Sequence, residues 1–233
     1  PSTAFALWYF DICCLGMKNS PWKNTTMARI APELDWLVMT DHSYAWERHA
    51  RNFLHLMQGI DPAEFSREPE SQFLRVRDVI FTGGTQPPFQ DREKALAGLR
   101  RRFSVAFYGR DAGQTVFGAR FWAEHQRSRV VFVPKPPSWT PRRYWSNRIY
   151  LATATGTPAV AGWTEGLEEH FKDGRDVLFY NTQAELESAV AMLVEDQGAR
   201  ERIGRAGRTR TILDHTYLKR AEPLLGAIFG RKT

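Results

Sequence analysis

The sequence predicts an α/β fold with parallel sheets. Short apolar runs, most of them closed by a polar residue, glycine or proline, alternate along the whole chain with segments that have helical patterning. In this alternation each helix returns the chain to the start of the next strand, which produces parallel sheets. The composition, 42% hydrophobic and 25% charged, is ordinary for a folded globular protein.

The first part of the chain predicts a small sheet. Its apolar runs are continuous, as is typical of strands buried on both faces. Residues 61–76 are polar and contain Pro62 and Pro69, which predicts a linker between two units. We expect a loop at 16–26, strands at 3–10, 36–39 and 53–57, and helices at 27–34 and 44–51.

The second part predicts a larger sheet that begins at Asp78 and leads into a glycine pair. Apolar residues at 186, 189, 190, 193 and 194 form one face of a helix. Further strands are expected at 104–108, 129–133, 158–161 and 177–180, and helices at 91–102, 116–126, 145–155, 184–194, 201–213 and 217–229. The predicted organisation is a first domain at 1–66, a second at 67–225 and a tail at 226–233.

Charge and cysteine usage restrict the function classes. The formal net charge is +6 and the pI is near 9.5, which suits a nucleotide diphosphate, a nucleic acid or an anionic membrane, or serves solubility alone. The adjacent cysteines Cys13 and Cys14 indicate reduced thiols and a cytoplasmic protein. The histidines lack the spacing of metal ligands, and no apolar run approaches the ~20 residues of a membrane span.

Three segments that follow strands could bind a ligand, because ligands of open α/β sheets lie beyond the carboxyl ends of the strands. Gly83 and Gly84 would allow a phosphate close to the backbone, or would simply make a tight turn. Ser146, Asn147 and Arg148 could contact phosphate, or cap a helix. Carboxylates at 165–169 could hold sugar hydroxyls, or belong to a solvated turn that ends at Asp173–Gly174.

Together these segments resemble a known family. The run Tyr144-Trp-Ser-Asn-Arg-Ile-Tyr-Leu-Ala-Thr-Ala-Thr-Gly-Thr-Pro-Ala-Val-Ala-Gly-Trp163, followed by Glu165-Gly-Leu-Glu-Glu-His-Phe-Lys-Asp-Gly174, resembles the donor-binding core of GT-B glycosyltransferases. It is most similar to the group 1 branch that includes spore-maturation-type proteins. The tail, with Arg202-Ile-Gly-Arg-Ala-Gly207 and His215-Thr-Tyr217, is similar to this branch as well. The resemblance covers residues 78 to 225, and a weaker likeness extends toward the N-terminus.

The resemblance implies two Rossmann-like domains, of which the N-terminal one, with three predicted strands, is short or truncated. It implies a nucleotide-sugar donor in the cleft, a leaving diphosphate neutralised by basic groups without a metal, and no other cofactor. Glu169 would lie near the donor sugar as a catalytic residue. Asp11, at the end of the first strand, is a candidate base on the acceptor, with a helix cap or a salt bridge as the alternative; Asp41 and His42 are similar candidates. The implied donor-binding residues are Gly83, Gly84, Arg110, Ser146, Asn147, Arg148, Glu165, Gly166 and Leu167.

One position departs from the family pattern. Relatives carry a glutamate that can hold the ribose where this chain has Leu151. The resulting hypothesis is a metal-independent hexosyltransferase that uses a UDP-sugar such as UDP-glucose and a hydroxyl acceptor, which could be a hydroxymethylated DNA base. The alternatives are a non-catalytic nucleic-acid- or partner-binding module on the same scaffold, and a nucleotide-sugar epimerase-like enzyme.

Overall fold

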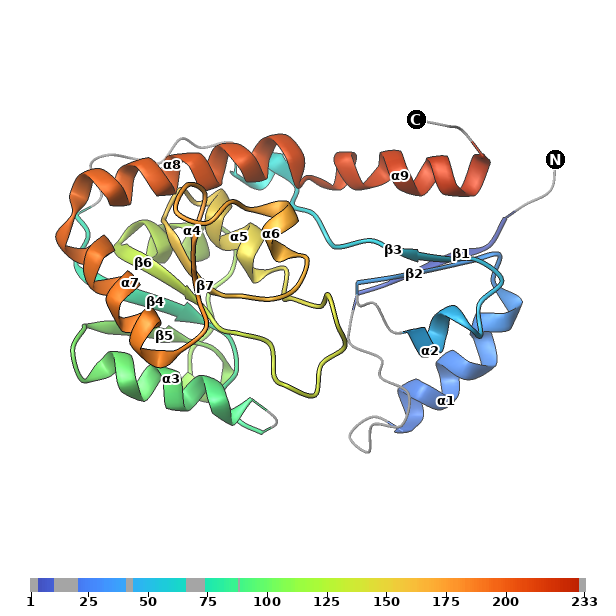
Figure 1. Ribbon diagram of the computed structural model, residues 1–233, viewed down its shortest axis with the longest axis horizontal. Coiled ribbons are helices and arrows are strands. Elements are labelled where there is room, and N and C mark those ends of the chain that lie inside the picture. The colour runs from blue at the N-terminus through green and yellow to red at the C-terminus, as the bar shows by residue number, and fades with distance from the viewer. Residues whose placement is uncertain (1–3, 11–20, 41–43, 66–73, 88, 231–233) are drawn as a thin grey trace.

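A computed structural model describes residues 4–10, 21–40, 44–65, 74–87 and 89–230. Figure 1 shows two units side by side, a small one built on β1, β2 and β3 and a larger one that contains the remaining strands. All registered strand pairs are parallel in both sheets. The predicted α/β fold with two parallel sheets is therefore confirmed.

The small unit has the strand order β1-β2-β3. Its strands are β1 (Ala6–Tyr9), β2 (Trp36–Met39) and β3 (Phe53–His55), and its helices are α1 (Pro21–Ile30), the 3-10 turn η1 (Ala31–Glu33) and α2 (Tyr44–Glu47). Met27, Ala31, Leu37, Met39 and Trp46 form its buried core. The helix α1 starts inside the polar segment 16–26, ahead of the helix expected at 27–34, because Pro21 fits the first position of a helix.

The larger unit has the strand order β5-β4-β6-β7-β8. The strands are β4 (Arg77–Thr82), β5 (Val105–Tyr108), β6 (Ser128–Val133), β7 (Ala159–Gly162) and β8 (Leu178–Tyr180). The helices are α3 (Gln90–Arg100), α4 (Gly118–Gln126), α5 (Arg148–Ala154), α6 (Leu167–His170), α7 (Gln183–Glu195), α8 (Gln197–Asp214) and α9 (Tyr217–Phe229), with 3-10 turns η2 (Pro62–Phe65) and η3 (Arg110–Ala112).

Alternating strand residues supply two apolar faces to this sheet. Ile80 and Val131 point to the face that α4 and α5 cover. Val79 and Val130 point to the opposite face, where residues of α3 and α7 pack. This three-layer arrangement buries both faces, which explains why the strands read as continuous apolar runs.

The chain crosses between the units twice. Met57, Ile60 and Phe65 belong to the core of the larger unit, so the packing changes just after β3 and before residue 66. Near the end of the chain α9 returns, and Tyr217 lies edge-on against Trp8 of β1. The helix α9 continues to Phe229, past residue 225 where the sequence analysis places the end of the second domain.

The two crossing segments are joined by backbone and side-chain contacts. Ile60 and Thr216 form a parallel bridge. The buried Arg220 donates hydrogen bonds to the carbonyls of Met57 at 3.0 Å and Asp214 at 3.2 Å. These bonds fix the path of the chain where it passes between the two sheets.

Glycines allow α8 to approach the larger sheet closely. A Cβ on Gly204 would overlap the carbonyl oxygen of Gly156, which is backbone and has little freedom to move. We expect Gly204→Ala to lower the free energy of unfolding by about 1–3 kcal/mol, the usual cost of overpacking. Gly198→Ala in the same helix is the control, because its Cβ would lie 3.4 Å from a side-chain oxygen of Asp196. Urea unfolding of both variants tests this, and equal stability would contradict the described packing.

In the part of the chain that the structure describes, none of the helices combines the length and the apolar character that a membrane span requires.

Candidate functional site

The candidate site lies at the carboxyl ends of the strands in the larger sheet, where open α/β sheets bind ligands. Gly83 and Gly84 follow β4 directly. The amide of Gly83 donates to the carbonyl of Tyr108 at 2.8 Å, which holds this loop beside the end of β5. The next helix, α3, begins only at Gln90, so its N-terminus does not immediately follow the glycines.

Arg148 lies against this glycine pair. It is the first residue of α5, and its guanidinium is so close that a Cβ on Gly83 would lie 2.5 Å from Nη2. Gly83 also has a φ of 150°, a region that residues with side chains rarely adopt. Glycine is therefore required here both for the backbone conformation and for the space that Arg148 fills.

A second arginine, Arg92 in the first turn of α3, approaches the same loop. Its Nη1 donates to the carbonyl of Gly84 at 3.1 Å, and its guanidinium lies 3.8 Å from the centre of the Phe89 ring. Burial, and then the charge of Arg92, lowers the pKa of Arg148 to about 10. The two cations therefore remain protonated near neutral pH although they repel each other.

No ion pair neutralises either arginine within the described part of the chain. The Nε of Arg92 is also buried without a hydrogen-bond partner. Half-buried cations that lack a carboxylate are costly, and an anion placed between them would relieve this cost. Arg92 and Arg148 with Gly83 and Gly84 therefore form a site suited to a phosphate or diphosphate; we call these residues the arginine pair and the glycine pair.

A cavity of about 380 Å³ reaches Arg92, one member of the arginine pair. Phe89 and Arg92 line it from the start of α3, and Tyr180 lines it from the end of β8. The loop after β6 supplies Pro134, Lys135, Pro136, Pro137 and Ser138. The hydroxyl of Tyr180 accepts a hydrogen bond from the amide of Lys135 at 3.1 Å, which fixes that loop.

Three further residues of the predicted donor site, Ser146, Asn147 and Arg110, make few side-chain contacts here. Ser146 Oγ accepts from the amide of Arg148 at 3.3 Å. Asn147 occupies the N-cap position of α5 but makes no side-chain cap bond. Arg110 begins η3 beside Asp111 and is exposed. Ser146 therefore contacts the backbone of Arg148, while the side chains of Asn147 and Arg110 form no hydrogen bond with either arginine among the described residues.

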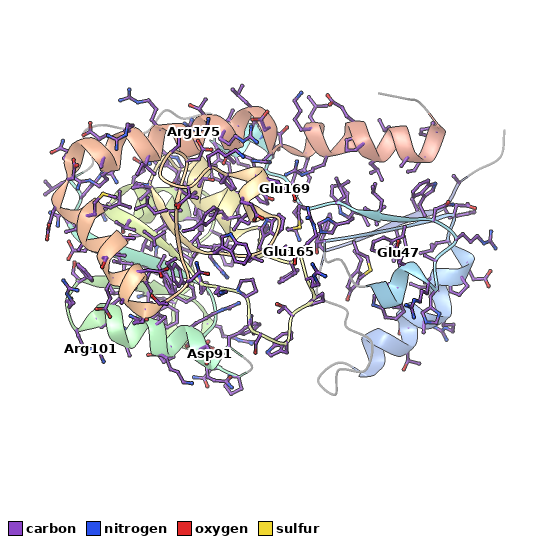
Figure 2. The ribbon with its side chains drawn as sticks, viewed as in Figure 1. Glu47, Asp91, Arg101, Glu165, Glu169 and Arg175 are labelled. Carbon is purple, nitrogen blue, oxygen red and sulfur yellow. The ribbon has the colours of Figure 1, made fainter. Side chains whose placement is uncertain are left out.

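Two ion pairs clamp the segment that carries the predicted carboxylates. Arg142 donates twice to Glu165, at 2.9 and 2.6 Å, and Arg143 donates to Glu169 at 2.8 Å. Figure 2 shows Glu165 and Glu169 on the side of the larger unit that faces the small one. The Arg143 hydrogen bond lowers the pKa of Glu169, so this carboxylate stays ionised near neutral pH and accepts hydrogen bonds.

The clamp uses unusual backbone geometry. Arg143 is the non-glycine residue with positive φ, at 56°, in the described chain. Gly166 has a φ of 89°, and its missing side chain leaves room for the Arg143 guanidinium, which would lie 3.0 Å from a Cβ there. The segment 165–170, expected to be a loop, also contains the short helix α6.

Leu167 of the predicted donor site and Leu151, the position that departs from the family pattern, both pack in the core. Leu167 is buried, so it can offer a ligand only its backbone. Leu151, at the position where relatives carry the glutamate, packs against the same core. Asp11, Asp41 and His42 lie outside the described residues, together with Cys13 and Cys14.

Aromatic and histidine side chains connect the two units beside Glu169. The ring of His55, at the end of β3, lies 6.5 Å from that of Trp145, and Trp145 lies 5.0 Å from His170. The Tyr150 hydroxyl accepts from Trp145 Nε1 at 2.9 Å and lies 2.9 Å from His170 Nδ1. The sequence did not lead us to this group or to Arg92, although Arg92 lies in the first turn of α3, the helix that follows the glycine pair.

The buried histidines should make stability depend on pH. Burial lowers the pKa of both His125 and His215 to about 4, and Arg220 donates to His215 Nδ1 at 3.0 Å, which keeps that nitrogen unprotonated. The unfolded chain binds protons near pH 6.5 and the folded chain does not, so stability is present above pH 6.5 and is lost as the pH falls. We expect the free energy of unfolding to drop by about 2 kcal/mol for each histidine between pH 7 and 5.

Urea unfolding at both pH values measures this effect. His125→Gln should remove about half of the pH dependence contributed by these two histidines. A free energy of unfolding that stays constant from pH 7 to 5 would contradict their buried, neutral state.

No cluster of three or more histidine, cysteine or carboxylate side chains suited to a metal ion occurs among the described residues. Metal independence stays a prediction.

Comparisons with known proteins support this interpretation of the fold. Residues 90–226 match the family model described as glycosyl transferase-like. No curated protein matches the chain by sequence. The structure of TarM aligns with this chain with a TM-score of 0.67 and 10% identity, over 95% of this chain and 49% of TarM. A structure of S. aureus TarM in complex with UDP is also similar. The chain therefore spans about half the length of that protein.

Two other solved structures are similar over more of their length. HepE of Anabaena in complex with UDP-glucose aligns with a TM-score of 0.62 and 14% identity, over 98% of this chain and 72% of HepE. WaaG, a glycosyltransferase involved in lipopolysaccharide biosynthesis, aligns with a TM-score of 0.64 and 14% identity, over 97% of this chain and 75% of WaaG. At these identities the likeness establishes the GT-B-like fold, and the family match covers more than half of the chain. The chain belongs to the glycosyl transferase-like family.

Proposed function

We propose that this protein binds a nucleotide-diphosphate sugar and transfers the sugar to a hydroxyl acceptor. The observation that carries the proposal is the arginine pair beside the glycine pair. The guanidiniums of Arg92 and Arg148, which have no carboxylate partners among the described residues, lie against the backbone of Gly83 and Gly84. This is the edge of the sheet at which α/β folds bind nucleotides. Arginine forks match phosphate oxygens geometrically, which favours a diphosphate over a single carboxylate.

The nucleoside is proposed to occupy the adjoining cavity of about 380 Å³. This cavity reaches Arg92, so a nucleoside there would leave its phosphates at the arginine pair. HepE, which shares the fold, has structures with UDP and with UDP-glucose. A UDP-sugar such as UDP-glucose is therefore the first donor to test.

The proposed chemistry relies on stabilising the leaving diphosphate. Negative charge builds on this group as the bond to the sugar breaks, and fixed cations in a half-buried site stabilise that charge. Glu169 would accept hydrogen bonds from sugar hydroxyls; its lowered pKa makes it unsuited to donate a proton. Metal-independent hexosyl transfer, a base role for Asp11 and a cytoplasmic location stay predictions.

The function is tested by mixing the protein with a panel of UDP- and GDP-sugars in the presence of EDTA. We expect UDP-sugars to raise the unfolding temperature and to be hydrolysed slowly to UDP and free sugar. The absence of both effects for every nucleotide sugar would refute the transferase proposal. A product that is still the nucleotide sugar, with an altered sugar, would favour the epimerase-like alternative.

A nucleic-acid role is the second candidate, and a separate observation favours it. A cavity of about 580 Å³ runs along α8, and Arg175, Arg202 and Arg205 line it. Arg202 and Arg205 are exposed and form no ion pair with the described residues. Glu201, Asp176 and Asp214 line the same cavity and reduce its net charge. This surface could hold the phosphates of a hydroxymethylated DNA acceptor, or serve a non-catalytic binding module.

Duplex DNA binding at several salt concentrations tests this candidate. A phosphate-dominated complex weakens steeply as salt increases. We expect Arg202→Ala/Arg205→Ala to reduce the salt slope, with Glu195→Gln as a control on the neighbouring helix. Negligible DNA binding at low salt would remove both the DNA acceptor and the nucleic-acid module.

A further inference from the structure

Asp111 holds the loop that carries the glycine pair. Its Oδ2 accepts the amide of Thr85 at 2.5 Å and the amide of Gln86 at 3.1 Å. The same oxygen would lie 3.2 Å from a Cβ on Gly84. These two backbone hydrogen bonds lower the pKa of Asp111, so the carboxylate is charged near neutral pH.

The loops after β4 and β5 are joined at more than this one point. The amide of Gly83 donates to Tyr108, and a Cβ on Gly109 would overlap the carbonyl oxygen of Gly83. Asp111 lies in η3, the turn that follows Gly109. The position of the glycine pair is therefore set from the neighbouring loop.

Asp111 contacts the same loop as Arg92 and Arg148, and among the described residues it forms no ion pair with either arginine. Its described bonds go to backbone amides, while Arg92 donates to the carbonyl of Gly84 and Arg148 lies against Gly83. The carboxylate and the guanidiniums thus use different groups of the same loop. Asp111 does not have to leave for an anion to reach the arginine pair.

We infer that Asp111 is a positioning residue for the proposed donor site. It accepts hydrogen bonds from the amides of Thr85 and Gln86, and these bonds hold the glycine pair in contact with Arg92 and Arg148. The donor's phosphates then accept hydrogen bonds from the two guanidiniums and not from the amides of Thr85 and Gln86. This inference rests on the proposed function. It adds Asp111, which lies outside the run 144–174 that resembles the donor-binding core and which is not among the residues that the resemblance implies for the donor.

Titrations of the whole chain with UDP and with uridine test the inference. We expect Asp111→Ala to weaken UDP binding by about tenfold or more, because the loop loses two charge-assisted bonds. Uridine binding, detected by NMR line broadening, should stay unchanged, because uridine lacks the phosphates. Asp111→Asn keeps an oxygen that can accept the amides and should cause a smaller loss, about threefold.

Glu195→Gln is the matched control, since it removes one carboxylate from the exposed end of α7 and should leave UDP binding unchanged. UDP binding that is unchanged or tighter in Asp111→Ala and Asp111→Asn would overturn the inference while the wild-type site stands. Equal losses for UDP and uridine would mean a general structural role and would overturn it as well. A wild-type chain that binds no UDP would refute the proposed function itself, and the inference with it.

Discussion

Replacing Arg148 by methionine is expected to weaken UDP binding about 100-fold while the fold becomes no less stable. The guanidinium supplies charge-assisted hydrogen bonds to phosphate, each worth about 1.5–3 kcal/mol, and tenfold in affinity corresponds to about 1.4 kcal/mol. In the free protein the same group is half-buried, repelled by Arg92 and without an ion pair among the described residues. Removing it therefore eliminates an unfavourable interaction. Isothermal titration with UDP and urea unfolding measure the two effects.

The opposite changes in affinity and stability distinguish a ligand-binding arginine from a structural one. The UDP affinity of Arg148→Lys should lie between those of the wild type and Arg148→Met, because lysine keeps the positive charge and loses the planar guanidinium. Arg202→Met removes an exposed arginine of α8 and controls for net charge. A clear loss of stability in Arg148→Met with unchanged UDP affinity would show that the arginine serves the fold.

Gly83→Ala is expected to weaken UDP binding by about 10- to 100-fold through a different route. The new Cβ would lie 2.5 Å from Nη2 of Arg148 and 3.1 Å from the ring of Phe81. The end of an arginine side chain is flexible, so the guanidinium moves away while the sheet stays intact. Titration with UDP measures the loss, and a crystal structure of the variant would show the displaced arginine.

Gly113→Ala is the matched control. Gly113 has a φ of 70° in the next loop, and a Cβ there has no heavy atom within 4 Å. Both substitutions impose strain of about 1–2 kcal/mol from an unfavourable backbone region. We expect both variants to lose stability and only Gly83→Ala to lose UDP affinity. Equal affinities in the two variants would contradict the close approach of Arg148 to the glycine pair.

Much of the larger sheet follows from local sequence patterns. Val130, Val131 and Phe132 are fully buried because both faces of β6 are covered by helices, and such a run is readable without knowing the partners. Ends of elements were less predictable. The helix α5 begins at Arg148 and not at Trp145, since Trp145 is buried and donates to Tyr150 across the turn.

Site residues that lie within one segment of the sequence could be predicted. Residues that reach the site from a separate segment could not. The glycine pair and Arg148 stand at strand and helix ends, so the general rule for α/β sheets finds them. Asp111 and His55 belong to elements that only the tertiary fold brings to the site, whereas Arg92 is near the glycine pair in the sequence but carries no motif that marks it. The pairing of Glu165 and Glu169 with Arg142 and Arg143 depends on a positive φ at Arg143, which the sequence does not signal.

The central claim is that the arginine pair and the glycine pair bind a nucleotide diphosphate. Isothermal titration of the wild-type chain with UDP tests it most directly, with the Arg92→Met/Arg148→Met double variant alongside. The predicted result is saturable binding at one site in the wild type and loss of that binding in the double variant. UDP binding of equal strength in both proteins, or none in the wild type, would contradict the claim.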